Sequence, residues 1–521
     1  MHTLTALRLR RDTPRQVMHR HGPVALLLLL LLGLPLQASA QQWHQHPYWP
    51  TDNDIPVSGR PVPELAWVDA EMRDFMQQRS IPGGVFGVMR NGRIVYLRGF
   101  GHDFNRNPLP ENTPFLLASV SKTITAAAAR HLIASGAIGL EDFVFDRDQV
   151  EGGVTVGGIL PANPYSAQDW EDSRVDEIRV THLIHHRSGW YVGVNGVRED
   201  YAFHDRECAE QLGVSSPPGP VNKIRCILGK ALGFRPGERA EYSNINTLLL
   251  GEVIKRVSGL SLEEYVRRHV MRWQIEIPET EIFGGRSFRG WQNPREPYYK
   301  TLNAHPDSAT GPWMVPNVFD GVGGATVERP YGGYDIETSV PYGGFVATAA
   351  AMLDFANYYD LRYSEDPGSS FGMPLGAAPL GWAGGHNGSL DGFETIIFQQ
   401  DIDADRRFRF FVAFNARSNS ETFFDSHWPT SFLNRVRAGL VSPTQAWSEV
   451  RSDGFWTQPG AELIAGVGGY HTPFRGFQRA LDRTTRGSRI RLKAGSQGWT
   501  GVLDRPMLID APEGAVTLGA Q

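Results

Sequence analysis

The spacing of apolar residues along the chain predicts a series of helices. Apolar side chains such as Val68, Met72 and Phe75 recur every three to four residues, the spacing of one face of a helix. The four alanines at 126–129, which are strong helix formers, lie in a stretch that stops at Gly136, a residue typical of helix ends. We therefore expect helices over residues 65–78, 121–135, 248–257, 262–273, 344–359 and 427–440.

Shorter apolar runs predict β-strands. Two runs rich in β-forming residues, 85–89 and 94–97, flank the Asn-Gly pair at 91–92, which is the strongest short signal of a β-hairpin. Further strands are expected over residues 396–398 and 408–414. The predicted elements form an α+β pattern: a helix and a hairpin come first, a long and mostly helical insertion follows, and more strands and a helix come last.

The first 40 residues differ from the rest of the chain. Five arginines precede an apolar run that holds seven consecutive leucines, and Ala38-Ser39-Ala40 has the small-x-small form of a cleavage site. These features predict a cleaved signal peptide over residues 1–40 and export to the periplasm or the medium. The apolar run is shorter than the roughly 20 residues of a membrane span, so we expect no stable span, with an uncleaved anchor as the alternative.

Composition and charge narrow the class of protein. The chain has 521 residues, of which 41% are hydrophobic, as is ordinary for globular proteins. Its net charge is −5 and its pI is near 6.4, so no basic surface for nucleic acid is expected. After the leader we expect a lead-in segment over 41–63, one main domain over 64–440 and a β- and turn-rich tail of unknown role over 441–521.

The cysteines and a histidine cluster are candidates for covalent or metal chemistry. Cys208 and Cys226 are the two cysteines, and in an exported protein a disulfide between them would be worth about 3 kcal/mol; two buried free thiols are the alternative. His182, His185 and His186 could share one face of a helix, but no acidic or Cys partner follows at ligand spacing. We therefore expect no metal.

Ser119 and Lys122 form the only Ser-x-x-Lys of the chain, which contains just six lysines. Residues three apart lie on the same face of a helix, so the ammonium is expected beside the hydroxyl. The N-terminus of the helix predicted from residue 121 adds positive potential. A serine in this setting can be activated as a nucleophile.

Two further segments carry candidate chemistry. Tyr242-Ser243-Asn244 is the only Tyr-x-Asn, and a phenol near a lysine is a plausible general base; a packed loop tyrosine is the alternative. The segment 385–389, Gly-His-Asn-Gly-Ser, precedes a predicted strand. Glycine there lets the backbone approach a substrate, and an N–H of the strand edge can face an oxyanion; a simple turn is the alternative.

The order of these three segments resembles that of the serine β-lactamase and penicillin-binding-protein superfamily. The branch it resembles most holds class C β-lactamases, D-alanyl-D-alanine carboxypeptidases, D-aminopeptidases and family VIII esterases. The resemblance implies a β-lactamase-like fold, an antiparallel sheet flanked by helices, with an inserted mainly helical subdomain. It covers roughly residues 64–440 and includes Ile81-Pro82-Gly83-Gly84, Thr181-His182-Leu183-Ile184 through Ser188-Gly189, Pro236-Gly237 through Leu250-Gly251, and Tyr342-Gly343-Gly344-Phe345.

The resemblance also implies a role for each matching residue. Ser119 would be the acylated nucleophile, and Lys122 would either take its proton or hold Tyr242 as a phenolate. Tyr242 would act as base during acylation and as acid toward the leaving group. Asn244 would hydrogen-bond the acyl chain of the substrate and orient Lys122. The backbone N–H groups of Ser119 and Ser389 would form the oxyanion hole, and no metal or organic cofactor is implied.

His386 departs from the pattern of the β-lactamases, which usually carry Lys-Thr-Gly at this position. That lysine pairs with a substrate carboxylate, for which a neutral imidazole is a poorer partner. The His-x-Gly of His386 and Gly388 looks more like D-aminopeptidase and esterase-type members. We therefore expect a secreted serine hydrolase whose partner is a small ester or a peptide or amide substrate. A β-lactamase or D-alanyl-D-alanine carboxypeptidase is the alternative, and a non-catalytic binding protein with the same fold is the alternative of another class.

Overall fold

All residues that the computed structural model describes lie in one compact unit, Asp52–Gln521. Beyond residue 445 it describes only 455–457, 477, 489–492, 495–497, 508–510 and 516–518. It describes residues 55–445 except for 104, 147–149, 152–153, 156, 166–169, 192–200, 273–276, 278–280, 302–313, 321–323, 364, 376–379, 405, 418–431 and 444.

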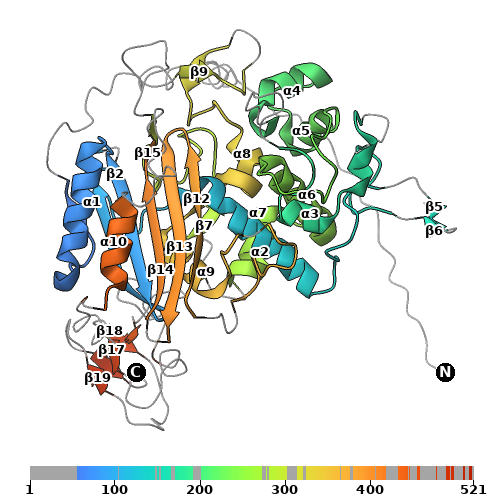
Figure 1. Cartoon of the computed structure of the whole chain (residues 1–521). Helices are drawn as coiled ribbons and strands as arrows, with labels where there is room; N and C mark the ends of the chain where they lie inside the picture. The colour runs from blue at the N-terminus through green and yellow to red at the C-terminus, as the bar shows by residue number, and fades with distance from the viewer. Residues whose placement is uncertain are drawn as a thin grey trace, which may run out of the picture. The chain divides into compact units, whose positions relative to one another are not determined.

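A six-stranded antiparallel sheet combines strands from both ends of the main domain in the order β1-β3-β2-β14-β13-β12 (Figure 1). The predicted hairpin is confirmed, and Asn91 and Gly92 at its turn have φ of 51° and 74°, as a tight hairpin turn requires. The strands are β1 (Val57–Ser58), β2 (Gly83–Arg90), β3 (Arg93–Gly101), β12 (Trp382–Leu390), β13 (Phe393–Asp403) and β14 (Arg406–Phe414).

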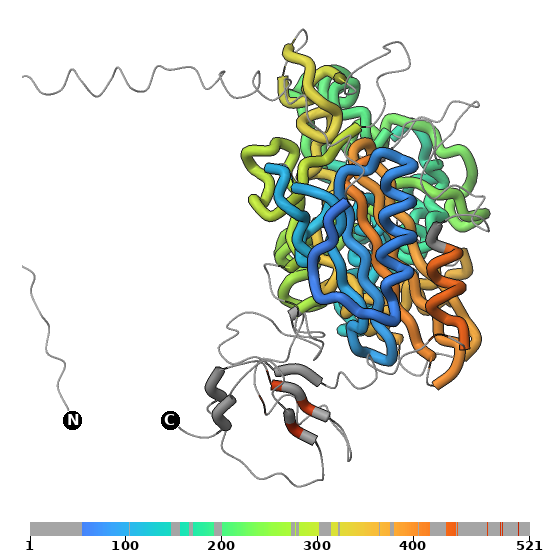
Figure 2. The backbone as a smooth tube through the Cα atoms, turned by 90° about the vertical axis from the view of Figure 1, so that its left-hand side faces the viewer, coloured from blue at the N-terminus to red at the C-terminus, as the bar shows by residue number. Residues whose placement is uncertain are grey.

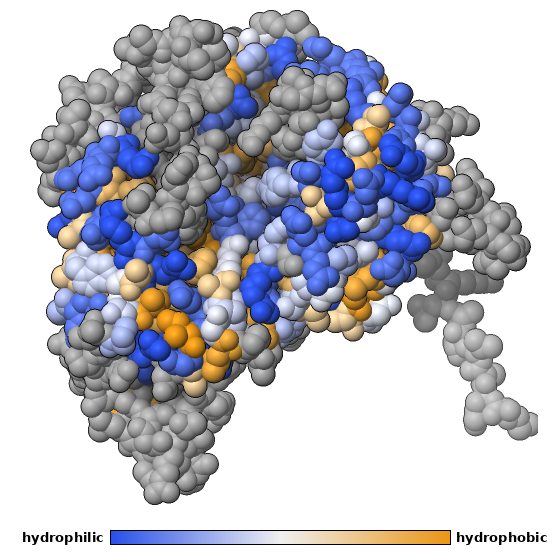
Figure 3. Space-filling model, viewed as in Figure 1, coloured by the Kyte–Doolittle hydropathy of each residue, from blue (hydrophilic) through white to orange (hydrophobic). Residues whose placement is uncertain are grey.

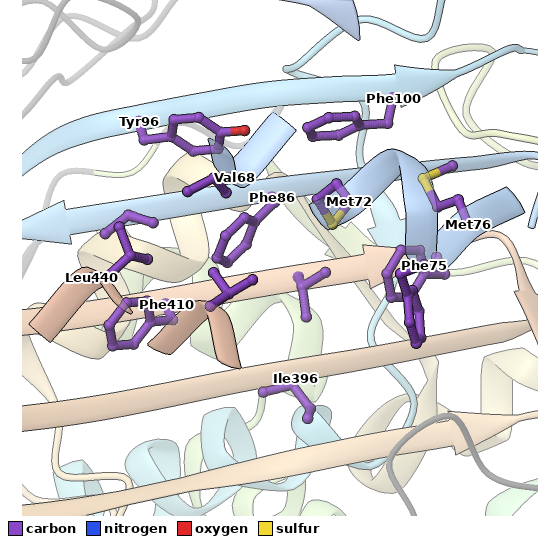
Figure 4. Packing of buried hydrophobic residues seen from close by; sticks show 14 of the residues in the cluster. Val68, Met72, Phe75, Met76, Phe86, Tyr96, Phe100, Ile396, Phe410 and Leu440 are labelled. Atoms are coloured by element: carbon purple, nitrogen blue, oxygen red, sulfur yellow. The ribbon is translucent and has the colours of Figure 1, made fainter. Parts of the chain in front are cut away.

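Two helices cover one face of this sheet, α1 (Ala66–Gln78) and α10 (Phe432–Val441), and they lie side by side (Figures 1 and 2). The buried residues of α1 are spaced four, three and one apart, which places them on one stripe facing the sheet. Figure 4 shows Val68 and Met72 of α1 and Leu440 of α10 packed with Phe86 and Phe410 of the strands. This cluster is an apolar core between these two helices and the sheet.

The opposite face of the sheet carries α9 (Ala349–Tyr358), which packs on β2, β13 and β14. Helix α2 (Ser121–Ala134) is buried along most of its length and packs against α6 (Asn244–Ser258). The predicted helical insertion is confirmed (Figure 1), and its helices include α3 (Val180–Ile184), α4 (Asp205–Leu212), α5 (Gly219–Leu228), α6 and α7 (Leu262–Tyr265).

The helices α4 and α5 are joined by two buried links. Cys208 and Cys226 form a disulfide with an S–S distance of 2.10 Å. Asp205 and Lys223 form an ion pair, and both side chains are almost completely excluded from solvent. Burial raises the pKa of Asp205, while nearby acidic groups and Tyr342 raise the pKa of Lys223. The Nζ of Lys223 also donates to the carbonyl oxygen of Ala202 at 2.8 Å.

The helix predicted over 344–359 is wrong in its first part. Residues 345–347 form a strand, β11 (Phe345–Ala347), between β4 (Phe115–Leu116) and β7 (Ile282–Gly284). These distant partners satisfy the backbone groups of Phe-Val-Ala, so α9 begins only after Thr348, whose hydroxyl caps it by accepting the N–H of Ala351 at 3.3 Å. The late helix is found over 432–441, and residues 427–431 lie outside the described residues.

The remaining elements are short. Two π-helical segments, η9 (Val266–Arg272) and η10 (Val340–Gly344), follow α7 and α8 (Ile336–Ser339). Within the described part of the chain no helix is long and apolar enough to cross a bilayer. The other short strands are β5 (Val150–Glu151), β6 (Val154–Thr155), β8 (Lys300–Thr301), β9 (Met314–Pro316), β10 (Thr326–Glu328), β15 (Ala416–Arg417), β16 (Phe455–Thr457), β17 (Arg489–Leu492), β18 (Gly495–Gln497), β19 (Leu508–Asp510) and β20 (Val516–Leu518).

Candidate active site

Ser119 lies in a short 3-10 turn, η4 (Ala118–Val120), directly before α2. The residue before it, Ala118, has a φ of 45°, a left-handed conformation that costs on the order of 1–3 kcal/mol for a residue with a Cβ. The segment is anchored by the N–H of Leu117, which donates to the carbonyl of Phe345 at 2.8 Å. The fold therefore imposes this turn and presents a partly exposed Ser119 at the N-terminus of a buried helix.

Lys122 and Tyr242 converge on the hydroxyl of Ser119. The Nζ of Lys122 donates to Ser119 Oγ at 2.9 Å, and the OH of Tyr242 donates to the same oxygen at 2.8 Å. Lys122 is 3% exposed, whereas Tyr242 is 43% exposed. The predicted trio thus comes together, with the lysine on the protein side and the phenol on the solvent side of the serine. Both distances are within reach of a proton transfer.

The position of Lys122 depends on a backbone carbonyl far away in the sequence. Its Nζ also donates to the carbonyl oxygen of Tyr342, in η10, at 2.7 Å. The OH of Tyr342 donates to the carbonyl of Ala202 at 2.8 Å and accepts from Ser339 Oγ at 2.9 Å. The ammonium also lies 5.0 Å from the centroid of the Tyr242 ring, an attractive cation–π distance.

Gly388 brings the edge strand β12 against the backbone of the serine. A Cβ at this position would lie 2.8 Å from Ser119 N and 2.3 Å from the carbonyl oxygen of Leu117. The same carbonyl accepts a hydrogen bond at 2.6 Å from Thr395, the residue opposite Gly388 in the sheet. Only glycine allows this approach, which keeps a side chain away from the N–H of Ser119, in the turn directly before α2.

The other residues of the third segment point in two directions. Side chains alternate along a strand, so His386 lies on the same face as the Gly388 position, toward Ser119, and Ser389 on the opposite face. Ser389 Oγ accordingly donates to Glu394 Oε1 at 3.1 Å across the strand pair. Its backbone N–H stays the predicted second oxyanion donor.

His386 is held in one tautomer. Its Nδ1 lies 2.6 Å from the carbonyl oxygen of Asn387, and because a carbonyl only accepts, Nδ1 carries the proton and Nε2 is an acceptor. Burial and, second, the ammonium of Lys122 lower the pKa of His386 to about 4. The imidazole is therefore neutral at neutral pH and offers a hydrogen-bond acceptor.

Asn244 is the first residue of α6, two positions after Tyr242, and it is 6% exposed. The side chain of Ser243 accepts from the N–H of Ile245 at 3.3 Å and so caps this helix. The cap fixes where the loop that carries Tyr242 ends. The contacts of Asn244 with an acyl chain and with Lys122 stay predictions.

Sequence reasoning considered His186 only as one of three candidate metal ligands, whereas in the structure its ring stacks on Tyr242 with centroids 4.9 Å apart. The neighbouring histidines face other groups. His182 Nδ1 accepts from the N–H of Arg179 at 3.2 Å, and His185 Nε2 lies 3.3 Å from Arg130 Nη2. No group of three or more His, Cys, Asp or Glu side chains in the described ranges is arranged to hold a metal.

The surface seen from the side of Figure 1 is mostly hydrophilic. Figure 3 shows small orange, apolar patches among blue and white residues on the described part of this face. The exposed large apolar side chains among the described residues are few, and Tyr242 is one of them. Its exposure fits a phenol that meets molecules from solution.

The fold and the Ser-Lys-Tyr geometry agree with a comparison to known families. The family model described as beta-lactamase matches residues 68–420, and the chain belongs to this family, within the superfamily of serine β-lactamases and penicillin-binding proteins. Members of this family are hydrolases.

Individual relatives match parts of the chain. A beta-lactamase of Pseudomonas fluorescens is 38% identical over 222 residues, which are 41% of this chain and 52% of the relative. The acyltransferase mokF of Monascus pilosus is 27% identical over 230 residues, 42% of this chain and 51% of the relative. The chain thus spans about half the length of these two curated relatives. The solved D-amino acid amidase of Ochrobactrum anthropi SV3, in complex with L-phenylalanine amide, is 15% identical with a TM-score of 0.48, over 73% of this chain and 100% of that one.

Proposed function

We propose that the protein is an exported serine hydrolase that cleaves a small ester, or a peptide or amide, through an acyl-enzyme on Ser119. The observation that carries the proposal is the convergence of Lys122 Nζ and Tyr242 OH on Ser119 Oγ at 2.9 and 2.8 Å. A serine flanked by two groups that can take its proton is an activated nucleophile. Export is part of the proposal because residues 1–40 have the form of a signal peptide.

The reaction has two halves. Ser119 Oγ passes its proton to whichever partner is deprotonated in the reacting state, Lys122 as a neutral amine or Tyr242 as a phenolate held by the Lys122 ammonium, and bonds to the acyl carbon, whose oxygen becomes an oxyanion. The N–H groups of Ser119 and Ser389 would receive that oxyanion, and one such donor is typically worth roughly 10²–10³ in rate. Tyr242 then gives a proton to the leaving alcohol or amine as its bond to carbon breaks. Tyr242, deprotonated by that transfer (or reprotonated from Lys122 when Lys122 was the first base, which leaves Lys122 as the free amine), takes a proton from the water that attacks the acyl carbon. The second oxyanion collapses, the bond from carbon to Ser119 Oγ breaks, and the same base returns the proton to Ser119 Oγ.

The substrate class follows from His386. Its neutral ring presents Nε2 as an acceptor, so it suits a substrate N–H or O–H better than a carboxylate. This favours esters and amides without a carboxylate at that point. A β-lactamase is the second candidate because the Pseudomonas fluorescens relative, at 38% identity, carries that description.

The test is labelling with a fluorophosphonate probe, with Ser119→Ala as the control. We expect an adduct that depends on Ser119; its absence in the folded wild type would leave the non-catalytic binding protein as the better explanation. Rates on short p-nitrophenyl esters, D-alanine p-nitroanilide and a chromogenic cephalosporin then rank the substrates. We expect ester cleavage to exceed cephalosporin turnover. The reverse ranking would contradict the inference that His386 disfavours substrates with a carboxylate.

A further inference from the structure

His186 touches three consecutive residues of the loop that carries the phenol. Its carbonyl oxygen accepts the N–H of Glu241 at 2.8 Å, and its ring stacks on Tyr242 with an interplanar angle of 29°. Its Nδ1 accepts the N–H of Ser243 at 3.2 Å. One residue of another loop therefore holds the chain before, at and after Tyr242.

These contacts fix the protonation of His186. A backbone N–H only donates, so Nδ1 offers a lone pair to Ser243, with the amide nitrogen of Asn246 also 3.3 Å away, and the proton sits on Nε2. Burial first, then the charge of Lys122, lower the pKa of His186 to about 3. The ring can therefore lie against the phenol without adding a second positive charge beside Lys122.

His186 itself is rigidly placed. It is 4% exposed, and its backbone has a φ of 53°, a left-handed conformation that the surrounding loop imposes. The ring of Tyr363 packs edge-on against it at 5.6 Å, and the OH of Tyr363 lies 3.4 Å from the carbonyl oxygen of His185. Tyr242, by contrast, is 43% exposed, so the buried imidazole gives a half-solvated phenol a fixed surface on which to rest.

We propose that His186 is a positioning residue that directs the hydroxyl of Tyr242 onto Ser119. The proposal rests on the proposed function, since it assigns His186 no contact with substrate and makes it act only through Tyr242. The physical reason is the steep dependence of proton transfer on geometry: a displacement of about 1 Å can cost about 100-fold in rate.

The test compares two variants that each keep half of the contact. His186→Phe keeps a ring to stack on Tyr242 and loses the acceptor for the N–H of Ser243, whereas His186→Asn keeps an acceptor and loses the stack. His186→Ala loses both. The control is His182→Asn, because His182 lies in α3, four residues before His186, and accepts the N–H of Arg179 at 3.2 Å.

The readout is kcat and KM for a p-nitrophenyl ester, per Ser119 titrated with the fluorophosphonate. We expect His186→Ala to lower kcat by about 10- to 100-fold with KM within about threefold, and each half-contact variant to recover part of the loss. His182→Asn should keep the wild-type kcat per titrated site. In a Tyr242→Phe background, His186→Asn should have almost no further effect, because residues that act as one unit are not additive.

The outcomes separate the two claims. If wild-type Ser119 does not react with the probe, the proposed function fails. If it reacts, and the His186 variants yield less folded protein but the wild-type kcat per titrated site, His186 is only structural and the inference is overturned. The inference is also overturned if His182→Asn lowers kcat equally, or if the losses from His186→Asn and Tyr242→Phe simply multiply. Should His186→Ala not fold, the Phe and Asn variants decide the matter.

Discussion

Replacing Gly388 by alanine adds a single methyl group at the point where β12 meets the backbone of Ser119. That methyl carbon would lie 2.3 Å from the oxygen of Leu117, 2.7 Å from Thr395 Oγ1 and 2.8 Å from Ser119 N. Ordinary contacts of a Cβ begin at 3.4 Å, so the strand and the η4 turn must separate by about 1 Å. The methyl group also stands in front of the N–H of Ser119.

Two effects of this methyl group add to the loss of rate. A shift of about 1 Å in the reacting groups can cost about 100-fold, and loss of one oxyanion donor costs roughly 10²–10³. We therefore expect kcat/KM for a p-nitrophenyl ester to fall by at least about 100-fold in Gly388→Ala. Overpacking should also lower the free energy of unfolding by about 1–3 kcal/mol, which leaves the protein folded at room temperature.

Gly343→Ala is the matched control, because Gly343 is a buried glycine next to the same turn. A Cβ there would lie 3.4 Å from Leu390 Cδ1 and 3.9 Å from the carbonyl carbon of Ala118, which are ordinary contacts. We expect its kcat/KM to stay within about threefold of wild type. Wild-type turnover in a folded Gly388→Ala protein would refute the reasoning. An equal loss of kcat/KM in both variants would show that any added methyl group near this turn lowers activity, so that the close approach of Gly388 to Ser119 N is not the cause.

Three further results are expected. Lys223→Met leaves Asp205 buried without its ion-pair partner and should lower the free energy of unfolding, measured by urea denaturation, by about 3–5 kcal/mol. The double variant Asp205→Leu/Lys223→Met should recover most of that loss, and an equal loss in the single and double variants would contradict the pairing. His386→Lys should lower KM for an ester that carries a carboxylate relative to p-nitrophenyl butyrate, and an unchanged ratio would mean that residue 386 faces away from the substrate. The pKa of His186 is about 3 in the folded protein and near 6.5 in the unfolded chain. The stability that neutral His186 contributes is therefore complete above pH 6.5. It is lost as the pH falls toward 3, and the free energy of unfolding then drops by about 5 kcal/mol at most. His186→Phe should flatten the dependence of the free energy of unfolding on pH in that window, and an unchanged slope would show that another group titrates there.

The local elements and the Ser119–Lys122 pair could be predicted from the sequence because their causes are local. Residues three apart meet on one face of a helix, and the 3-10 turn at 118–120 runs directly into the helix at 121–134, so the serine hydroxyl and the lysine ammonium are neighbours. The Asn-Gly turn likewise determines its hairpin through φ values that few residues adopt. The spacing of Val68, Met72 and Phe75 determines which face of α1 meets the sheet.

Contacts between distant segments could not be predicted in this way. The strand at 345–347 pairs with residues near 115 and 283, so its neighbours in sequence, which favour a helix, did not indicate it. In the sequence His186 was one of three neighbouring histidines that could share a helical face, and only the packed structure shows its ring against Tyr242. The family resemblance predicted that Tyr242 acts together with Ser119. The 2.8 Å distance between Tyr242 OH and Ser119 Oγ, however, results from how the segments that carry them pack together.

The sequence by itself thus determined the hairpin, most of the helices and the lysine beside the nucleophile, because backbone preferences and helical spacing act over a few residues. The tertiary structure alone decided what holds Lys122 in place, the carbonyl of Tyr342 220 residues away, and what keeps the N–H of Ser119 open, the missing side chain of Gly388. These contacts join segments that are far apart in the sequence, and their spacing along the chain does not tell how close they lie in the folded protein. Only burial of the apolar core brings them together.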